Sequence, residues 1–120
     1  MTTTTAFDIA AFARSYETWD LPALLACYDD DVELVQVDRD HGPSAPRVRS
    51  GKALFEGMFT HCARAGAVVT IDRELADGDR AAATVTCEFP NGRRVIANCM
   101  LELRDGRIVR EHEVLLGDPA

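Results

Sequence analysis

The sequence predicts an α+β fold in which a strongly bent antiparallel sheet wraps around three helices from the N-terminal half. Apolar residues recur at helical spacing in the first half of the chain, whereas from Ala67 onward they follow strand-like patterns. The turn-forming pairs Asp77-Gly78, Asn91-Gly92 and Asp105-Gly106 divide this second half into four consecutive strands. A length of 120 residues is typical of a single domain, which we assign to residues 1–120.

The composition is that of a folded globular protein. Hydrophobic residues make up 47% and charged residues 28% of the chain, and the formal net charge of −7 disfavours nucleic acid as a partner. Residues 1–5 lack the basic and apolar regions of a signal peptide, and no apolar run is long enough to span a membrane. We therefore expect a cytoplasmic protein without a membrane partner, and a disordered tail over residues 1–5.

The sequence contains no pattern typical of a metal or cofactor site. The four cysteines are far apart and form no CxxC pair, which favours reduced thiols that pack as small hydrophobic side chains: Cys27, Cys62, Cys87 and Cys99. The pair Gly51-Lys52 lacks the other residues of a phosphate-binding loop. We expect neither a metal nor a cofactor.

Helical patterns predict the three helices. Thr5 and Asp8 fit a capping box for a first helix. Its apolar positions are Ile9, Phe12, Ala13, Tyr16 and Trp19. Asp20 caps a second helix that runs to the acidic residues 29–31. A third helix begins at Gly51 and ends at Gly66. Its buried stripe is predicted to be Leu54, Phe55, Met58, Phe59 and Cys62.

A strand over residues 32–37 separates the second and third helices. It is predicted to place Val32, Leu34, Gln36 and Asp38 on one face. Residues 39–49 contain a glycine and two prolines, which favour a mobile loop.

The hairpin at Asn91-Gly92 decides which side chains of its two strands face inward. If Asn91-Gly92 is a two-residue turn, paired residue numbers add to 183, so Cys99 lies opposite Thr84 and shares the inner face with Thr86. The opposite face then presents an apolar set that needs cover, and we expect a homodimer through this convex face: Val85, Phe89, Ile96 and Met100.

The last hairpin leaves two alternatives open. A two-residue turn at Asp105-Gly106 places His112 opposite Cys99 and directs it inward. A bulge of one residue beside Gly106 turns His112 outward and brings Glu111 and Glu113 inward instead.

Four short strings resemble the SnoaL-like and ketosteroid isomerase-like branch of the nuclear transport factor 2-like superfamily. They are residues 19–24 (WDLPAL), 27–32 (CYDDDV), 49–55 (RSGKALF) and 103–109 (LRDGRIV). The resemblance implies a cone-shaped, mixed sheet of the cystatin-like α+β barrel type, a mostly apolar pocket and a dimer. It also places Phe12, Gln36 and Cys99 where ketosteroid isomerases carry their tyrosine, base and protonated aspartic acid, so that family's own isomerisation chemistry is not expected.

These patterns predict a small enzyme without a cofactor that isomerises, cyclises or dehydrates an apolar carbonyl-containing metabolite. Asp38 or Gln36 would act at one end of the pocket, and His112 or Glu113 at the other. The substrate-binding residues are predicted to be Phe12, Tyr16, Trp19, Phe55, Met58, Phe59, Thr84, Thr86, Cys99 and Leu101. The alternative is a non-catalytic domain that binds a small molecule or a protein.

Overall fold

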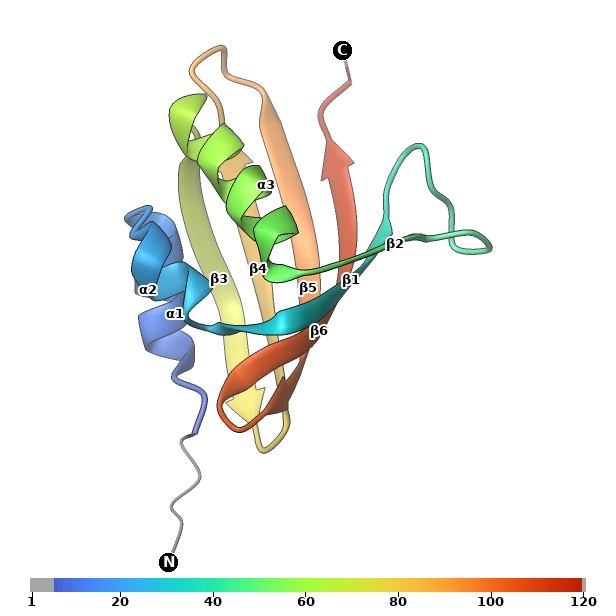
Figure 1. Cartoon of the computed structure of the whole chain (residues 1–120). Helices are drawn as coiled ribbons and strands as arrows, with labels where there is room; N and C mark the ends of the chain where they lie inside the picture. Colours follow the sequence, from blue (N-terminus) through green and yellow to red (C-terminus); the bar gives the residue numbers. More distant parts are fainter. Residues whose placement is uncertain (1–5, 120) are drawn as a thin grey trace, which may run out of the picture.

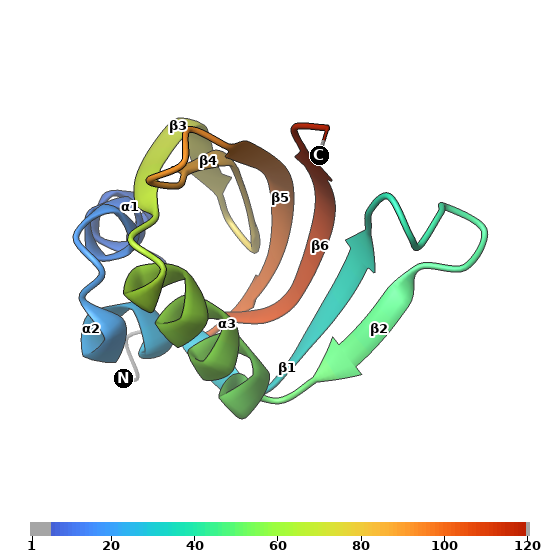
Figure 2. The same cartoon turned by 90° about the horizontal axis from the view of Figure 1, so that it is seen from above.

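The protein forms a curved, six-stranded mixed sheet with three helices on its concave side (Figures 1 and 2), in a computed structural model that describes residues 6–119. The strands are β1 (Tyr28–Val37), β2 (Arg47–Ser50), β3 (Val68–Asp77), β4 (Arg80–Glu88), β5 (Arg94–Arg104) and β6 (Arg107–Gly117). Their order is β2-β1-β6-β5-β4-β3, and only β1 and β6 run parallel. The predicted α+β class is confirmed, although the sheet stays open because β2 and β3 are free edges. The tail predicted for residues 1–5 lies outside the described residues.

The helices are α1 (Ile9–Glu17), α2 (Leu21–Leu25) and α3 (Lys52–Arg64). Asp8 is itself the N-cap of α1, and its carboxylate accepts a hydrogen bond from the backbone N–H of Ala11 at 2.9 Å. It therefore does not act as the third helical residue of a capping box. Asp20 caps α2 as predicted, through the N–H of Ala23.

The end of the second helix was predicted wrongly. Helix α2 stops at Leu25, and the acidic residues 29–31 already belong to β1. The parallel pairing with β6 stabilises this extended conformation, because Cys27 O accepts a hydrogen bond from the N–H of Ile108 at 2.8 Å. Tyr28 and Val32 are then fully buried on the concave side.

The predicted loop over residues 39–49 also contains regular structure. Its last residues form the short edge strand β2, which pairs antiparallel with β1. Figure 2 shows that this hairpin projects from the body of the protein. On β1, Val32, Leu34 and Gln36 are buried on one face, in agreement with the predicted alternation.

The register of the β4–β5 hairpin differs by one residue from the prediction. Paired residue numbers add to 182, so Cys99 lies opposite Ala83. The cause is a three-residue loop over residues 90–92, in which Gly92 adopts a φ of 87° and Phe89 N–H donates to Arg93 O. A shift of one residue exchanges the two faces of a strand.

This register corrects two groups of predicted positions. Thr84 and Thr86 point to the outer face and do not line a pocket, and the Thr84 hydroxyl donates to Asn98 Oδ1 there. Val85 and Phe89, both predicted on the convex face, lie on the inner side of the sheet, where Val85 is buried. Ile96 and Met100 remain exposed on the outer face, as predicted.

The β5–β6 hairpin contains a one-residue bulge, as the second alternative requires, but the bulge is at position 109 and not beside Gly106. Leu103 pairs with Ile108, but Glu102 pairs with Arg110, so Val109 is the extra residue. Glu111 and Glu113 consequently face the concave side. The inward alternative for His112 is wrong, because its side chain lies on the outer face.

Aromatic side chains fill one end of the concave side. The rings of Tyr28 and Phe55 are 4.5 Å apart between centroids, and both residues are fully buried. Phe12 packs beside Tyr28 at 6.3 Å. No helix among residues 6–119 is long and apolar enough to cross a membrane.

Candidate active site

The opposite end of the concave side contains a cavity of about 230 Å³, near the β4–β5 turn. Helices α1 and α3 form one wall, and strands β1, β4, β5 and β6 form the other. The lining residues are Tyr16, Gln36, Met58, Phe59, His61, Cys62, Val85, Cys87, Phe89, Val95, Ala97, Glu113 and Leu115. The cavity is therefore mostly apolar, with a few polar groups on its walls.

Apart from the outward-facing Thr84 and Thr86, the predicted substrate-binding residues fall into three groups. Tyr16, Met58 and Phe59 line the cavity. Cys99 is buried next to it, behind the carboxyl groups of β6. The remaining inward-facing residues pack in the core instead, because the aromatic cluster fills that end of the sheet: Phe12, Trp19, Phe55 and Leu101. Trp19 donates its Nε1–H to Ala67 O at 2.8 Å.

Two glutamates form the chemical centre of the site. Glu111 and Glu113 are two residues apart on β6, so both side chains point to the concave face. One oxygen of each carboxyl and the Cys99 sulfur lie within 4.8 Å of one another. These three side chains are also the group, among the described residues, that could ligate a metal ion.

Burial changes the protonation of this pair. The pKa of Glu111 is raised to about 8, mainly by burial and further by the neighbouring charge of Glu113. The hydrogen bond that Tyr28 donates to Glu111 acts in the opposite direction and lowers this pKa. Burial likewise raises the pKa of Glu113, whereas hydrogen bonding to Gln36 and the charge of Arg49 lower it. Both shifts favour the protonated form, so at neutral pH the pair retains a proton that the two carboxyl groups share.

A chain of hydrogen bonds orients Glu113. The Gln36 Nε2 donates to Glu113 Oε2 at 2.7 Å, and Arg49 Nη2 donates to Gln36 Oε1 at 3.2 Å. Because a guanidinium can only donate, the Gln36 oxygen must face Arg49 and its NH₂ group must face the carboxylate. Sequence analysis missed Arg49, which lay in the predicted loop. The alternation Arg47-Val48-Arg49-Ser50 was the available signal of a strand.

Tyr16 supplies a hydroxyl to the same cavity. Its ring packs edge-on against Phe59, with centroids 5.1 Å apart. Burial, followed by the charge of Glu111, raises the Tyr16 pKa well above its usual value, so the phenol stays protonated. No described side chain hydrogen-bonds to this hydroxyl, which leaves it available as a donor to a ligand.

Asp38 does not line the cavity. Its Oδ1 accepts hydrogen bonds from His41 Nδ1 and from the backbone N–H groups of Asp40 and His41, each at 2.9 Å. The hydrogen bond from the His41 side chain is the main cause that lowers the pKa of Asp38. A carboxylate held in this turn with a lowered pKa is a poor general base.

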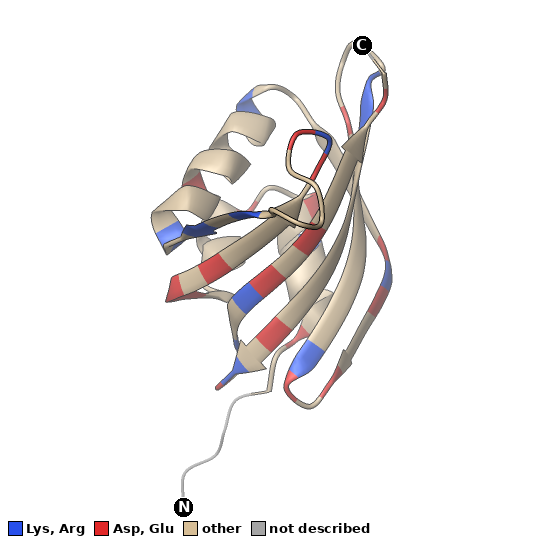
Figure 3. Cartoon of the chain, turned by 90° about the vertical axis from the view of Figure 1, so that its right-hand side faces the viewer, with Lys and Arg blue, Asp and Glu red and all other residues tan. Residues whose placement is uncertain are grey.

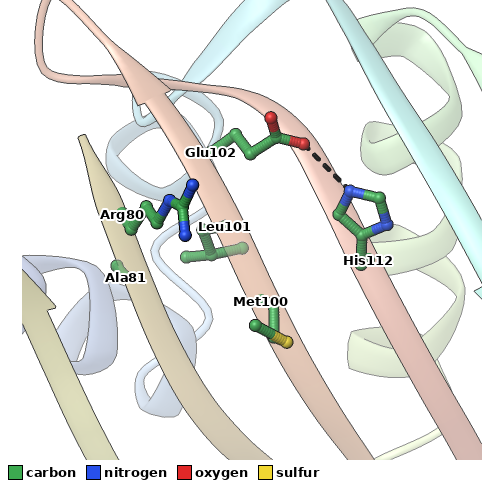
Figure 4. Close-up of a pocket in the computed structure, with 6 residues that line it drawn as sticks. All are labelled: Arg80, Ala81, Met100, Leu101, Glu102 and His112. Atoms are coloured by element: carbon green, nitrogen blue, oxygen red, sulfur yellow. Dashed lines mark hydrogen bonds and ion pairs between the residues drawn. The ribbon is translucent and has the colours of Figure 1, made fainter.

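His112 also lies away from the cavity. Figure 4 shows it in a shallow pocket on the outer face, where its Nε2 is 2.9 Å from Glu102 Oε2. Its side chain is 48% exposed. The structure therefore leaves Gln36 and Glu113 as the two predicted catalytic candidates that reach the cavity.

The thiols around the cavity are neutral side chains. Burial raises the pKa of Cys87 to about 11 and the pKa of Cys99 well above its usual value. Burial also raises the pKa of Cys62. They therefore contribute small apolar surface rather than a thiolate nucleophile.

Helices packed on the concave side of an open, mixed sheet define the NTF2-like class of α+β folds. The family model of the SnoaL-like domain matches residues 9–111, so the chain belongs to this family. No curated protein sequence matches the chain.

Solved structures share the fold at low sequence identity. An NTF-2 like protein of unknown function from Burkholderia xenovorans is 19% identical with a TM-score of 0.72, covering 93% of this chain and 81% of its own. A proposed ketosteroid isomerase from Kribbella flavida is 20% identical with a TM-score of 0.71, covering 93% and 76%. A proposed polyketide cyclase from Pseudomonas putida is 23% identical with a TM-score of 0.66, covering 88% and 86%. Identities in this range establish the fold alone.

Proposed function

We propose that this protein is a cofactor-independent enzyme that transfers protons on a small carbonyl-containing compound, in an isomerisation, cyclisation or dehydration. The observation that carries the proposal is the buried carboxyl pair of Glu111 and Glu113 beside an apolar cavity that also contains the Tyr16 hydroxyl. A carboxylate with a raised pKa is a suitable base near neutral pH.

The geometry assigns a role to each group. Glu113 lines the cavity, so its carboxylate takes the proton from the carbon next to the carbonyl. The electron pair of the broken C–H bond forms the C=C bond of an enolate, and the π pair of the carbonyl group moves to its oxygen, to which Tyr16 donates a hydrogen bond. Glu113 then returns the proton to another carbon in an isomerisation, or to the hydroxyl group that leaves as water in a dehydration. In a cyclisation the enolate carbon forms a bond to a second carbonyl carbon of the same molecule, and the proton goes to the alkoxide that results. Glu111 is a positioning residue, because it does not line the cavity, although one of its carboxyl oxygens lies within 4.8 Å of one on Glu113.

The comparisons support this class of reaction at a coarse level. Two structural neighbours are described as a proposed isomerase and a proposed cyclase, and both reactions begin with proton transfer next to a carbonyl. The residues that this chain would use differ from the positions that the sequence resemblance suggested. The proposal therefore rests on the carboxyl pair of this chain and not on the neighbours.

Exchange of α-protons with D₂O tests the proposal without knowledge of the natural substrate. The probe is 2-indanone, an enolisable ketone, and NMR follows the loss of its α-proton signal. We expect the protein to accelerate exchange, and Glu113→Gln to reduce the acceleration by about a hundredfold or more. Glu102→Gln, the same change on the outer face, should have no effect. Equal rates for Glu113→Gln and the unmodified protein would refute the assigned base.

The second candidate, a domain that only binds a small molecule, is favoured by the mostly apolar lining of the cavity. It predicts that 2-indanone binds without any acceleration of exchange. The same NMR experiment therefore distinguishes the two functions.

A further inference from the structure

We infer that the cavity accepts a neutral carbonyl compound of one or two fused rings and excludes four-ring ligands of steroid size. The inference rests on the proposed function, because it concerns the same site, and it names the class of substrate. Three features of the cavity carry it: its volume, the fixed walls around it and the charges that line it.

The volume limits the size of the ligand. A cavity of about 150 Å³ with apolar walls holds one benzene molecule, which corresponds to roughly 25 Å³ for each non-hydrogen atom. The 230 Å³ of this cavity then hold about nine such atoms. Sites for larger, drug-sized ligands usually have about 300–1,000 Å³. A one- or two-ring compound matches the space, whereas a four-ring compound does not.

The walls prevent the cavity from extending into the rest of the concave side. Phe59 separates it from Tyr28 and Phe55, and the ring centroid of Phe59 is 5.8 Å and 6.0 Å from theirs. Tyr28 is 1% exposed and Phe55 is fully buried, so this end of the sheet is already filled. On the sheet side, Val85 and Ala97 form a cross-strand pair of buried residues. A ligand that extends in this direction would have to displace closely packed core side chains.

The charges favour a neutral ligand. Glu113 is the acidic group on the wall, and a bound anion would lie beside it. Arg49 is not among the lining residues, although its Nη2 contacts two of them, the Gln36 oxygen at 3.2 Å and Met58 Sδ at 3.9 Å. His61 is the lining residue that could become cationic, and it is exposed at the cavity mouth. Carboxylates and phosphates therefore find no arginine or lysine among the lining residues.

Binding of two neutral ketones tests the size limit. Isothermal titration should detect 2-indanone, whereas the four-ring ketone androst-4-ene-3,17-dione should bind at least about tenfold more weakly or not at all. Ala97→Leu fills the cavity and should weaken 2-indanone binding by about tenfold or more. Ala82→Leu makes the same change on the outer face of the neighbouring strand and should leave binding unchanged. Leu115→Phe, at a half-buried lining position, serves as the second narrowing variant if Ala97→Leu does not fold.

The outcomes separate this inference from the proposed function. Steroid binding as tight as that of 2-indanone, no binding of 2-indanone, or binding that neither narrowing variant weakens would each overturn the size limit. A different result separates the two proposals: 2-indanone binds, the narrowing variants weaken this binding, and α-proton exchange is not accelerated. This result supports the size limit and overturns the catalytic proposal.

Discussion

The Gln36 amide nitrogen lies 2.7 Å from Glu113 Oε2 and connects the carboxyl group of the cavity to the edge strand β2. The parallel pairing of β1 with β6 places these two residues side by side, although they are 77 positions apart in sequence. Arg49 on β2 donates a hydrogen bond from its Nη2 to the Oε1 atom of the same Gln36 amide. A residue outside the cavity thus influences the orientation and the pKa of Glu113.

Replacement of Arg49 by methionine should move the pH dependence of catalysis to higher pH. The positive charge lowers the Glu113 pKa, so its removal raises that pKa, and the ionised base is then populated only at higher pH. The rate of 2-indanone α-proton exchange as a function of pH measures this shift. Arg49→Lys should restore much of the original profile. Arg47→Met, an exposed neighbour on the same strand, should leave it unchanged, and an unshifted profile for Arg49→Met would contradict the role assigned to Arg49.

Glu111 should make the folded protein less stable as the pH rises. Its pKa is about 8 in the folded state and about 4.3 in an unfolded chain, so between these values the folded state binds more protons. The stabilisation is fully present below about pH 4 and is lost progressively up to about pH 8, on the order of a few kcal/mol. Denaturant unfolding at pH 5.5 and pH 8.5 measures the difference. Glu111→Gln should remove most of it, and an unchanged difference in that variant would show that another group is responsible.

Tyr16→Phe should slow α-proton exchange with little effect on binding. The hydroxyl is not hydrogen-bonded to any described side chain, so its removal leaves no buried partner unpaired, and the ring keeps its contact with Phe59. Because the hydroxyl would stabilise charge that develops on the carbonyl oxygen, we expect a loss of about tenfold to a hundredfold in the exchange rate at saturating 2-indanone. A variant with weakened binding and an unchanged maximal rate would instead indicate that Tyr16 only contributes to affinity.

The outer face of the sheet should form a homodimer interface. Its exposed apolar side chains lie on the neighbouring strands β5 and β6: Ile96, Met100, Val114 and Leu116. Beside them, a row of alternating charges crosses the sheet (Figure 3), in which paired residues carry opposite signs: Glu33, Arg110, Glu102, Arg80 and Asp77. Such a row can face a second copy of itself with opposite charges adjacent.

Sedimentation velocity provides the measurement for this prediction. The unmodified protein should sediment as a dimer, and Met100→Asp should shift it toward the monomer because it places a charge in an apolar contact. Leu75→Asp, on the exposed edge strand β3, tests whether the interface is confined to β5 and β6. A monomer at all concentrations of the unmodified protein would refute the prediction.

The periodicity of apolar residues was sufficient to predict the three helices and the four consecutive strands. It did not determine which face of each strand is buried, because the parity depends on single residues in turns. Pro90 before Asn91-Gly92 was a usable signal, since proline suits the second position of a type I turn that continues into a three-residue loop. The polarity of Thr84 was a second usable signal, because a rule that places threonines on the outer face of the sheet would have predicted its observed side.

The candidate site was predictable in part for the same reason. Gln36 followed from strict alternation along β1, whereas Glu111 and Glu113 depended on a bulge at Val109 that no nearby residue type requires. The contact between Gln36 and Glu113 depends on the parallel pairing of two distant strands, which periodicity cannot reveal. Arg49 was missed because the short alternation over the four residues of β2 was outweighed by the glycine and prolines that precede it.

The aromatic core and the cavity occupy opposite ends of the same concave surface, and this separation has an evolutionary consequence. Substitutions at lining residues, for example Val95 or Leu115, can change the shape of the cavity. They leave the packing of the core residues Tyr28 and Phe55 unchanged. Specificity can therefore diverge faster than the scaffold. Proteins that share less than a quarter of their residues can accordingly retain one common framework around different reactions.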